Sequence, residues 1–356
     1  MNHAYHEFVS RTHRKVVNTL KRWRHDHARH PELAQRSVLI FSAALFGLII
    51  AFFQIIPILH AEQTPLSIAT PAAPSPAKEA DPTQHNSLFA THPSWSQNFT
   101  TQTSGLPDPL YWNVLVGPAE NSNSEQQYYS DSNANLRLNN SGLHLIGTHQ
   151  SQPGGYQYGS ARLETQGKQS FLYGRIDISA KLPSGSGTWP ALWLLPANNT
   201  YANKSPKGDA LRYRNGGEID IMESVGFQPD LIYGVAHTLS DSNLRSDGTG
   251  SYKTVKVPGS STSFNTYTVL WTPTTITFAV NDVAYFTYAR QAGANYTTWP
   301  FDQPFYLIAN LALGGTWGGM DTAHFPDNGI DNNALPASFD IASIYYYSYI
   351  GSTDVK

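Results

Sequence analysis

The chain has 356 residues, 23 basic and 26 acidic side chains, and a formal net charge of −3 at pH 7. This nearly neutral balance argues against a nucleic-acid partner, and the lack of cysteine excludes disulfide bonds and thiolate metal sites. At 40% hydrophobic and 12% aromatic, the sequence can bury one large core or two modest ones.

The N-terminal sequence predicts a membrane anchor. Residues 1–37 carry eight lysines and arginines against three acidic residues, and residues 38–59 then read VLIFSAALFGLIIAFFQIIPIL. At about 1.5 Å per residue, such a helix spans roughly 33 Å, which matches a bilayer core of about 30 Å. We therefore expect an uncleaved transmembrane signal anchor at 38–59, with residues 1–37 as a basic cytoplasmic segment. A buried core helix is one alternative, and a signal peptide cleaved after Ala61 is a stronger one.

Residues 60–93 are rich in Pro, Ala, Ser and Thr and have no periodic apolar pattern. This composition predicts an extended, disordered tether. Residues 94–356 then form one folded domain outside the cytoplasm, at the cell surface or secreted if the anchor is cleaved.

The remaining sequence predicts an all-β fold. Short alternating or β-branched runs are separated by Gly, Asn, Asp, Pro and Ser, as in GLHLIGTH, YGRIDISAKL, EIDIMES, YTVLWT and FYLIANLAL. No segment after residue 60 keeps a helical apolar period over a dozen residues, so a sandwich or barrel is expected.

One of these strands contains an unusual group of acids. The stretch NGGEIDIMESVGF, residues 215–227, places Glu218, Asp220 and Glu223 among apolar residues. Side chains alternate along a strand, so Glu218 and Asp220 share a face while Glu223 falls out of phase. A β-bulge at Ile221 and Met222 would return Glu223 to that face.

Carboxylates gathered on one face have a specific chemical use. Because they cannot all ionise easily, one keeps its proton while another stays charged, which supplies an acid and a nucleophile. Glycoside cleavage needs this pair, about 5 to 5.5 Å apart in retaining enzymes and about 6.5 to 9.5 Å apart in inverting ones. A solvated acidic edge strand and a cation site remain as alternatives.

Aromatic residues in other segments suit a sugar-binding cleft. Trp189 and Trp193 lie in SGSGTWPALWLLP, and Trp317 lies in the glycine-rich NLALGGTWGG. Core packing is the alternative for each tryptophan. His237 gains a role only if its strand neighbours the acid strand.

Several blocks of sequence together resemble glycoside hydrolase family 16, the laminarinase-like jelly-roll glucanases. GEIDIMESVG matches the family signature E-x-D-x-x-E, and the resemblance from Trp95 to Ile350 also includes SEQQYYSDSNANLRLNNSGLHLIG, YGSARLETQGKQSFLYGRIDISAKLPSGSGTWPALWLLP, FYLIANLALGGTWGG and FDIASIYYYSYI. The resemblance implies a jelly-roll β-sandwich of two curved antiparallel sheets, so that residues 94–356 would be a glycoside hydrolase catalytic domain.

The resemblance also assigns roles to individual residues. It implies that Glu218 is the nucleophile, that Glu223 is the acid/base, and that Asp220 orients and tunes the pair. The residues that it implies for the sugar cleft are Asn123, Arg162, Trp189, Trp193, His237 and Trp317.

The spacing of the acids narrows the range of expected substrates. Met222 is the extra residue that β-1,3-glucanases, agarases and carrageenases of the family have and that lichenases lack. Bases are few between Ser184 and Val235, which favours a neutral β-1,3-glucan and retaining endo-hydrolysis. The alternatives are a mixed-linkage glucanase, an agar-type galactan hydrolase, a transglycosylase, and a noncatalytic glucan-binding or adhesion protein at the cell surface.

The expected partners are a polysaccharide substrate and, through the N-terminal helix, a membrane, with the catalytic domain monomeric and no nucleic acid bound. We expect no cofactor for catalysis. The resemblance implies a structural calcium ion at Asp340, with a solvated strand aspartate as the alternative.

Overall fold

The structure, a computed structural model, describes residues 66–67, 88–102, 104–119, 123–198, 200–201, 216–240 and 251–351. The chain divides into two units, 1–64 and 65–356, and every described residue belongs to the second. The predicted basic segment 1–37 and anchor 38–59 lie outside the described residues and stay predictions. Within the described residues, no helix is long and apolar enough to cross a membrane.

The described residues form two β-sheets, as the sequence predicted. One sheet has eight strands in the order β1 (Leu66–Ser67), β14 (Tyr252–Lys256), β13 (Leu231–His237), β12 (Glu218–Glu223), β11 (Thr188–Pro196), β18 (Phe305–Leu313), β9 (Arg162–Glu164) and β3 (Asn113–Val114). The other has the path β17 (Val283–Ala289), β16 (Thr275–Val280), β15 (Asn265–Trp271), β10 (Gly174–Lys181), β19 (Ala337–Tyr347), β7 (Gly142–His149), β8 (Tyr158–Ser160), β5 (Gln127–Tyr129) and β4 (Gly117–Pro118). Beside this path, β2 (Trp95–Asn98) pairs with β19, and β6 (Leu136–Asn139) pairs with β7.

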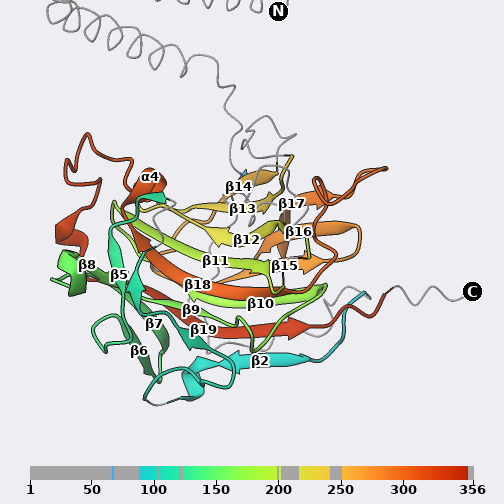
Figure 1. The fold of residues 1–356 in the computed structure, drawn as a ribbon, viewed down its shortest axis with the longest axis horizontal. Coiled ribbons are helices and arrows are strands. Elements are labelled where there is room, and N and C mark those ends of the chain that lie inside the picture. The colour runs from blue at the N-terminus through green and yellow to red at the C-terminus, as the bar shows by residue number, and fades with distance from the viewer. Residues whose placement is uncertain are drawn as a thin grey trace, which may run out of the picture. The chain divides into compact units, whose positions relative to one another are not determined.

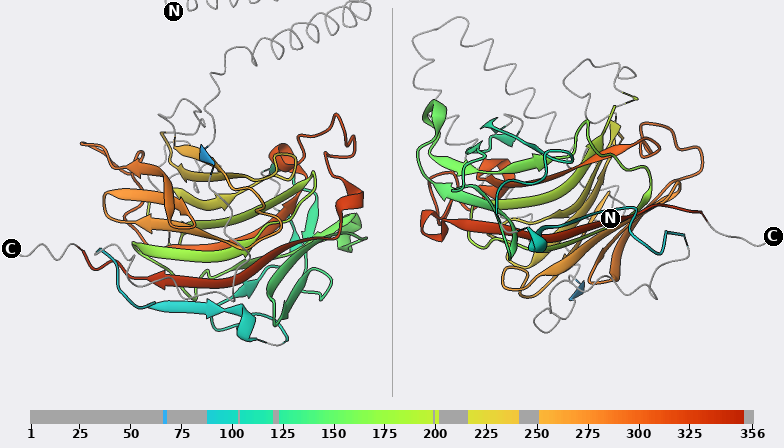
Figure 2. Two further views of the ribbon diagram at one scale, coloured as in Figure 1. Left: turned by 180° about the vertical axis from the view of Figure 1, so that it is seen from behind. Right: turned by 90° about the horizontal axis from the view of Figure 1, so that it is seen from below.

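Figures 1 and 2 show the two sheets as curved layers whose strands run in similar directions. The described helices are short: η4 (Phe99–Thr101), η6 (Pro153–Gly155), α4 (Gly315–Gly318) and η9 (Asn332–Ala334). Most strand pairs are antiparallel, as expected, but β1 with β14 and β5 with β8 are parallel. In the second exception, β6 and β7 lie between β5 and β8 along the chain. Because β7 is antiparallel to both β6 and β8, β8 runs in the direction of β6 again and can pair in parallel with β5.

The core lies between the two sheets. In β11, Leu192 and Leu194 are fully buried in it, whereas Trp189 and Trp193 alternate with them and are only partly buried. Trp271 of the opposite sheet is also in this core, at 1% exposure. Strand alternation therefore leaves the eight-stranded sheet with a second face, pointing away from the core, which we call the open face.

The folded domain begins before the predicted boundary at residue 94. Phe89 is 1% exposed and pairs with Tyr349, and the backbone nitrogen of Ile350 donates to the carbonyl of Leu88 at 2.9 Å. Burial of this aromatic ring explains why the end of the predicted tether joins the domain. The short strand β1 also lies within the predicted tether, whose other residues before 88 are outside the described ranges.

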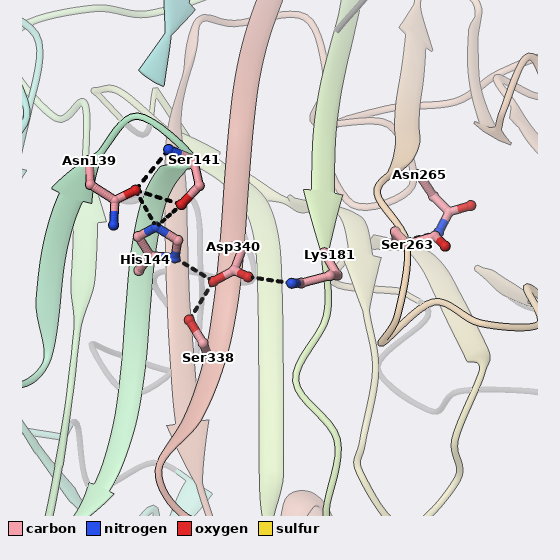
Figure 3. Close-up of polar contacts among 8 residues, drawn as sticks. All are labelled: Asn139, Ser141, His144, Lys181, Ser263, Asn265, Ser338 and Asp340. Atoms are coloured by element: carbon pink, nitrogen blue, oxygen red, sulfur yellow. Dashed lines mark hydrogen bonds and ion pairs between the residues drawn. The ribbon is translucent and has the colours of Figure 1, made fainter. Parts of the chain in front are cut away.

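Asp340, the residue expected to hold calcium, lies in β19 on the sheet opposite the open face, and its carboxylate is already satisfied (Figure 3). Lys181 Nζ is 2.9 Å from Oδ2, His144 Nδ1 is 2.7 Å from Oδ1, and the hydroxyl of Ser338 also donates to Oδ1. Burial opposes ionisation, but these three contacts lower the pKa of Asp340 to about 2. A calcium ion favours six to eight oxygen ligands, so nitrogen partners that include an ammonium group do not fit it.

We expect a metal chelator to leave the melting temperature of the protein unchanged, because Lys181 supplies the positive charge that a cation would supply. Lys181→Met should instead cost about 1 to 3 kcal/mol by leaving a largely buried carboxylate oxygen unpaired. Calorimetry with and without chelator tests the effect of the chelator and that of Lys181→Met. The control is Lys256→Met, which removes a lysine from an exposed position of β14. A melting temperature that falls on chelation would contradict this account and restore the calcium site.

Candidate active site

The predicted bulge in β12 is confirmed by the pairing of its neighbours. On β13, Val235 pairs with Asp220 and Tyr233 pairs with Glu223, so one residue, Gly234, opposes both Ile221 and Met222. The register with β11 shifts at the same point. The strand therefore contains one residue more than either neighbour between its second and third acids.

Burial along β12 shows the effect of the bulge. Ile219, Ile221 and Met222 all belong to the core cluster, at 0 to 1% exposure. Paired residues on antiparallel strands point to the same side, and Glu223 is paired with Ala191 of β11 while Asp220 is paired with Trp193. The three acids therefore share the open face with the tryptophans of β11.

Glycines at two positions allow this strand to fit. Gly217, immediately before the strand, has φ of +77°, and a Cβ there would lie 2.5 Å from a carbon of Pro300. Gly234 lies opposite the bulge, next to Phe278 and Tyr285. A Cβ on Gly234 would lie 2.4 Å from the Tyr285 hydroxyl. Any larger side chain at either position would displace its neighbours and move the acids.

His237 is brought to the acids by strand pairing. It is the partner of Glu218 across β12 and β13. Its Nε2 lies 2.9 Å from Asp220 Oδ2 and 3.9 Å from Glu218 Oε1. The strand of His237 therefore neighbours the acid strand, which is the arrangement that a role for His237 required.

All three acids resist ionisation. Burial is the largest cause, and it raises the pKa of Glu218 and Glu223 to about 8 and that of Asp220 to about 7. The charge of Asp220 raises the pKa of both glutamates further, whereas His237 lowers both. Because each ionisation hinders the next, the cluster keeps at least one proton at neutral pH.

Aromatic side chains form one wall beside Glu223. The indole Nε1 of Trp189 donates to Glu223 Oε1 at 2.9 Å. Trp317 of α4 packs edge-to-face against Trp189 at 5.3 Å between ring centroids, and against Tyr233 at 4.8 Å. The two tryptophans that the sequence singled out in separate segments therefore meet at the acid/base candidate.

A second group on the open face fixes Trp193. Its indole Nε1 donates to Asn310 Oδ1 at 2.7 Å, and the guanidinium carbon of Arg162 lies 5.2 Å from its ring centroid. Arg162 also contacts Glu164 at 3.3 Å. The described contacts thus pair this arginine with a carboxylate and an aromatic face.

Asn123 occupies the edge of the same region. Its Nδ2 donates to Glu125 Oε1 at 3.3 Å, and Glu125 Oε2 accepts from Gln127 at 2.7 Å and from the hydroxyl of Tyr129. Tyr129 in turn contacts Asn310 at 3.3 Å. A polar network therefore connects Asn123 to the residue that holds Trp193.

Three residues that contribute to the site were not predicted from the sequence: Tyr233, Asn310 and Glu164. Each carried a signal. Tyr233 precedes His237 by four residues on one strand, which places both on one face, and Asn310 is the single amide in the otherwise apolar FYLIANLAL. Glu164 follows Arg162 by two residues and therefore points to the same side.

Comparison with known proteins gives consistent results. The family model "Glycosyl hydrolases family 16" matches residues 118–326. A beta-glucanase of Rhodothermus marinus is 40% identical over 72% of this chain and 85% of the relative. A keratan-sulfate endo-1,4-beta-galactosidase of Sphingobacterium multivorum is 32% identical over 71% of this chain and 54% of the relative.

Solved structures agree with this assignment. The laminarinase from Rhodothermus marinus matches with a TM-score of 0.63 at 39% identity, and the match covers 73% of this chain and 98% of the laminarinase chain. The residues matched by the family model include the acid strand β12. The chain therefore belongs to glycosyl hydrolase family 16.

Proposed function

We propose that this chain is a retaining endo-acting glycoside hydrolase that cleaves β-1,3-glucan of the laminarin type with a jelly-roll catalytic domain. The observation that carries the proposal is the bulged strand β12, which gathers Glu218, Asp220 and Glu223 on the open face beside two tryptophans. The names of the Rhodothermus marinus relatives, a beta-glucanase and a laminarinase, support the substrate class.

In the proposed mechanism, Glu218 attacks the anomeric carbon while Glu223 protonates the departing glycosidic oxygen. Burial and the charge of Asp220 raise the pKa of Glu223, which favours the protonated form needed for the first step. Glu223 then activates water to release the sugar from Glu218, with the β configuration retained.

Asp220 and His237 act as positioning residues in this scheme. Burial and the charge of Asp220 raise the pKa of Glu218 to about 8, and His237 opposes this rise. Its Nε2 lies 2.9 Å from Asp220 and 3.9 Å from Glu218, where it favours the ionised nucleophile. The charge of Asp220 raises the pKa of both glutamates. After Glu218 has lost its proton, Glu223 therefore tends to keep its own.

The described open face favours an uncharged glucan over a sulfated galactan. Within the described residues, Arg162 lies beside Trp193, where it is stacked on the ring and paired with Glu164. A sulfate group would have to compete with both contacts. A noncatalytic binding protein is disfavoured because both glutamates are present on one face.

We also propose that residues 38–59 anchor the chain in a membrane and that the catalytic domain works outside the cytoplasm as a monomer. The proposal rests on the apolar run and its basic flank.

The mechanism predicts opposite behaviour for the two glutamates when azide is added. Glu223→Ala should lower turnover of laminarin about 10²- to 10⁴-fold, and azide should restore turnover of an activated aryl glycoside with a β-glycosyl azide as product. Glu218→Ala should yield no β-glycosyl azide, since no covalent intermediate forms. Proton NMR of the products decides, and an α anomer as the first product of the wild-type enzyme would refute retention.

The proton held by Glu223 also predicts how stability depends on pH. Its pKa is raised in the folded protein, so between about pH 4.3 and pH 8 the folded state binds a proton that the unfolded state has lost. Stability therefore falls as pH rises through this window. Glu223→Gln removes this penalty, so the melting temperature of the variant relative to wild type should rise by several degrees from pH 5 to pH 8.

Calorimetry at the two pH values gives the measurement. Asp131→Asn, at an exposed carboxyl, is the control for the loss of one negative charge alone. A Glu223→Gln difference that stays constant or shrinks toward pH 8 would mean that Glu223 ionises as easily in the folded state as in the unfolded chain.

A further inference from the structure

A cavity of about 520 Å³ lies away from the acids, at the end of the sandwich where β5, β7 and β8 approach the loop before η9. Figures 1 and 2 show β5 and β8 beside the chain that follows α4. The residues that line it include none of those assigned above to the catalytic site, and those that carry its chemistry are Gln126, His149, Tyr156, Gln157, Tyr158 and Asn332.

Aromatic rings form part of the cavity wall. His149 and Tyr158 are cross-strand partners whose rings stack 5.0 Å apart. Tyr156 is partly exposed and packs against Tyr128 at 6.0 Å between centroids. Flat rings that are supported from behind can accept the apolar face of a pyranose at little cost in conformational entropy.

Carboxamides supply the polar part, and three of them are already oriented. Gln126 Nε2 donates to the carbonyl of Ser124, and Gln157 Nε2 donates to that of Gly155, which leaves their Oε1 atoms as acceptors. Asn332 Oδ1 accepts from the Tyr158 hydroxyl at 3.0 Å, which leaves its Nδ2 as a donor. Oriented donors and acceptors of this kind match the hydroxyl groups of a sugar.

The charge of the lining excludes other ligand classes. Among the described lining residues there is no lysine or arginine, and the one histidine, His149, stacks on Tyr158, so a phosphate or sulfate has no permanently charged cationic partner there. Asp327 is the one carboxylate among the lining residues that the structure describes, which is too few for a divalent cation. A neutral, polyhydroxylated ligand remains, and a saccharide is the one that pairs with aromatic faces and amides.

We infer that this cavity is a second saccharide-binding site, separate from the catalytic face, that holds a glucan chain while another part of the chain is cleaved. The inference rests on the proposed function for the identity of the sugar. The two sites share one segment: Glu125 belongs to the network around Asn310, and Gln126 lines the cavity and bonds through its backbone nitrogen to Leu313 just before α4.

Binding tests the inference without relying on hydrolysis. The full chain carrying Glu218→Ser is run on native gels that contain laminarin, and the shift in mobility gives a Kd. Addition of Tyr156→Ala should raise the Kd at least threefold, whereas addition of Tyr345→Ala, which removes the same atoms from a partly buried position on β19, should not. Equal Kd values for the two variants would overturn the inference.

A second pair of variants guards against a folding defect at Tyr156. Gln157 and Gln291 are both exposed, and each donates from Nε2 to the carbonyl two residues earlier. Gln157→Ala should therefore weaken binding to laminarin while Gln291→Ala leaves it unchanged. Hydrogen exchange should show residues 152–158 protected by laminarin, and protection confined to β11 and β12 would contradict a second site.

Kinetics separate this inference from the proposed function. In the active enzyme, Tyr156→Ala should lower kcat/KM for laminarin relative to that for a laminari-tetrasaccharide at least threefold, because the short chain cannot reach both sites. If the wild-type enzyme cleaves neither substrate, the proposed function fails while the gel assay still reports on the cavity. If it cleaves both and the ratio is unaffected by Tyr156→Ala, the second site fails alone.

Discussion

The extra residue in β12 is the constraint on which the site depends. Ile221 and Met222 both enter the core opposite Gly234, so the strand passes from Asp220 to Glu223 without losing its open face. In a regular strand, Glu223 would point into the apolar layer between the sheets, where an ionised carboxylate costs several kcal/mol. The bulge thus converts an alternating strand into one that presents three acids and still buries three apolar side chains.

Gathering the acids creates an electrostatic problem that the neighbouring strands moderate. Burial raises the pKa of every member, and the charge of Asp220 acts on both glutamates. His237 from β13 and the indole of Trp189 from β11 favour ionisation from the two sides. The cluster therefore holds a proton at neutral pH, and it also has His237 and Trp189 to stabilise an ionised carboxylate. The proton serves the acid, and the ionised carboxylate serves as the nucleophile.

The sequence predicted much of this because its strongest signals are local. The strand alternation, the phase of Glu218, Asp220 and Glu223, and the need for a bulge all follow from spacing along one segment. The partners of Trp193 could not be found in this way, because Asn310 and Arg162 come from strands 117 and 31 residues distant along the chain, and only sheet order brings them together. Calcium at Asp340 was expected from resemblance, whereas the charge there comes from Lys181, whose approach depends on the pairing of β10 with β19.

The central claim is that Glu218 is the nucleophile and that Glu223, which the bulge brings to the same face, is the acid/base, and it is tested most directly by trapping the glycosyl-enzyme. A 2-deoxy-2-fluoro laminaribioside with an activated leaving group slows hydrolysis of the covalent intermediate, so that peptide mass spectrometry can locate the sugar. We predict a single modification, on Glu218. A sugar on Glu223 or Asp220, or turnover of this reagent to an α product without any covalent adduct, would contradict it.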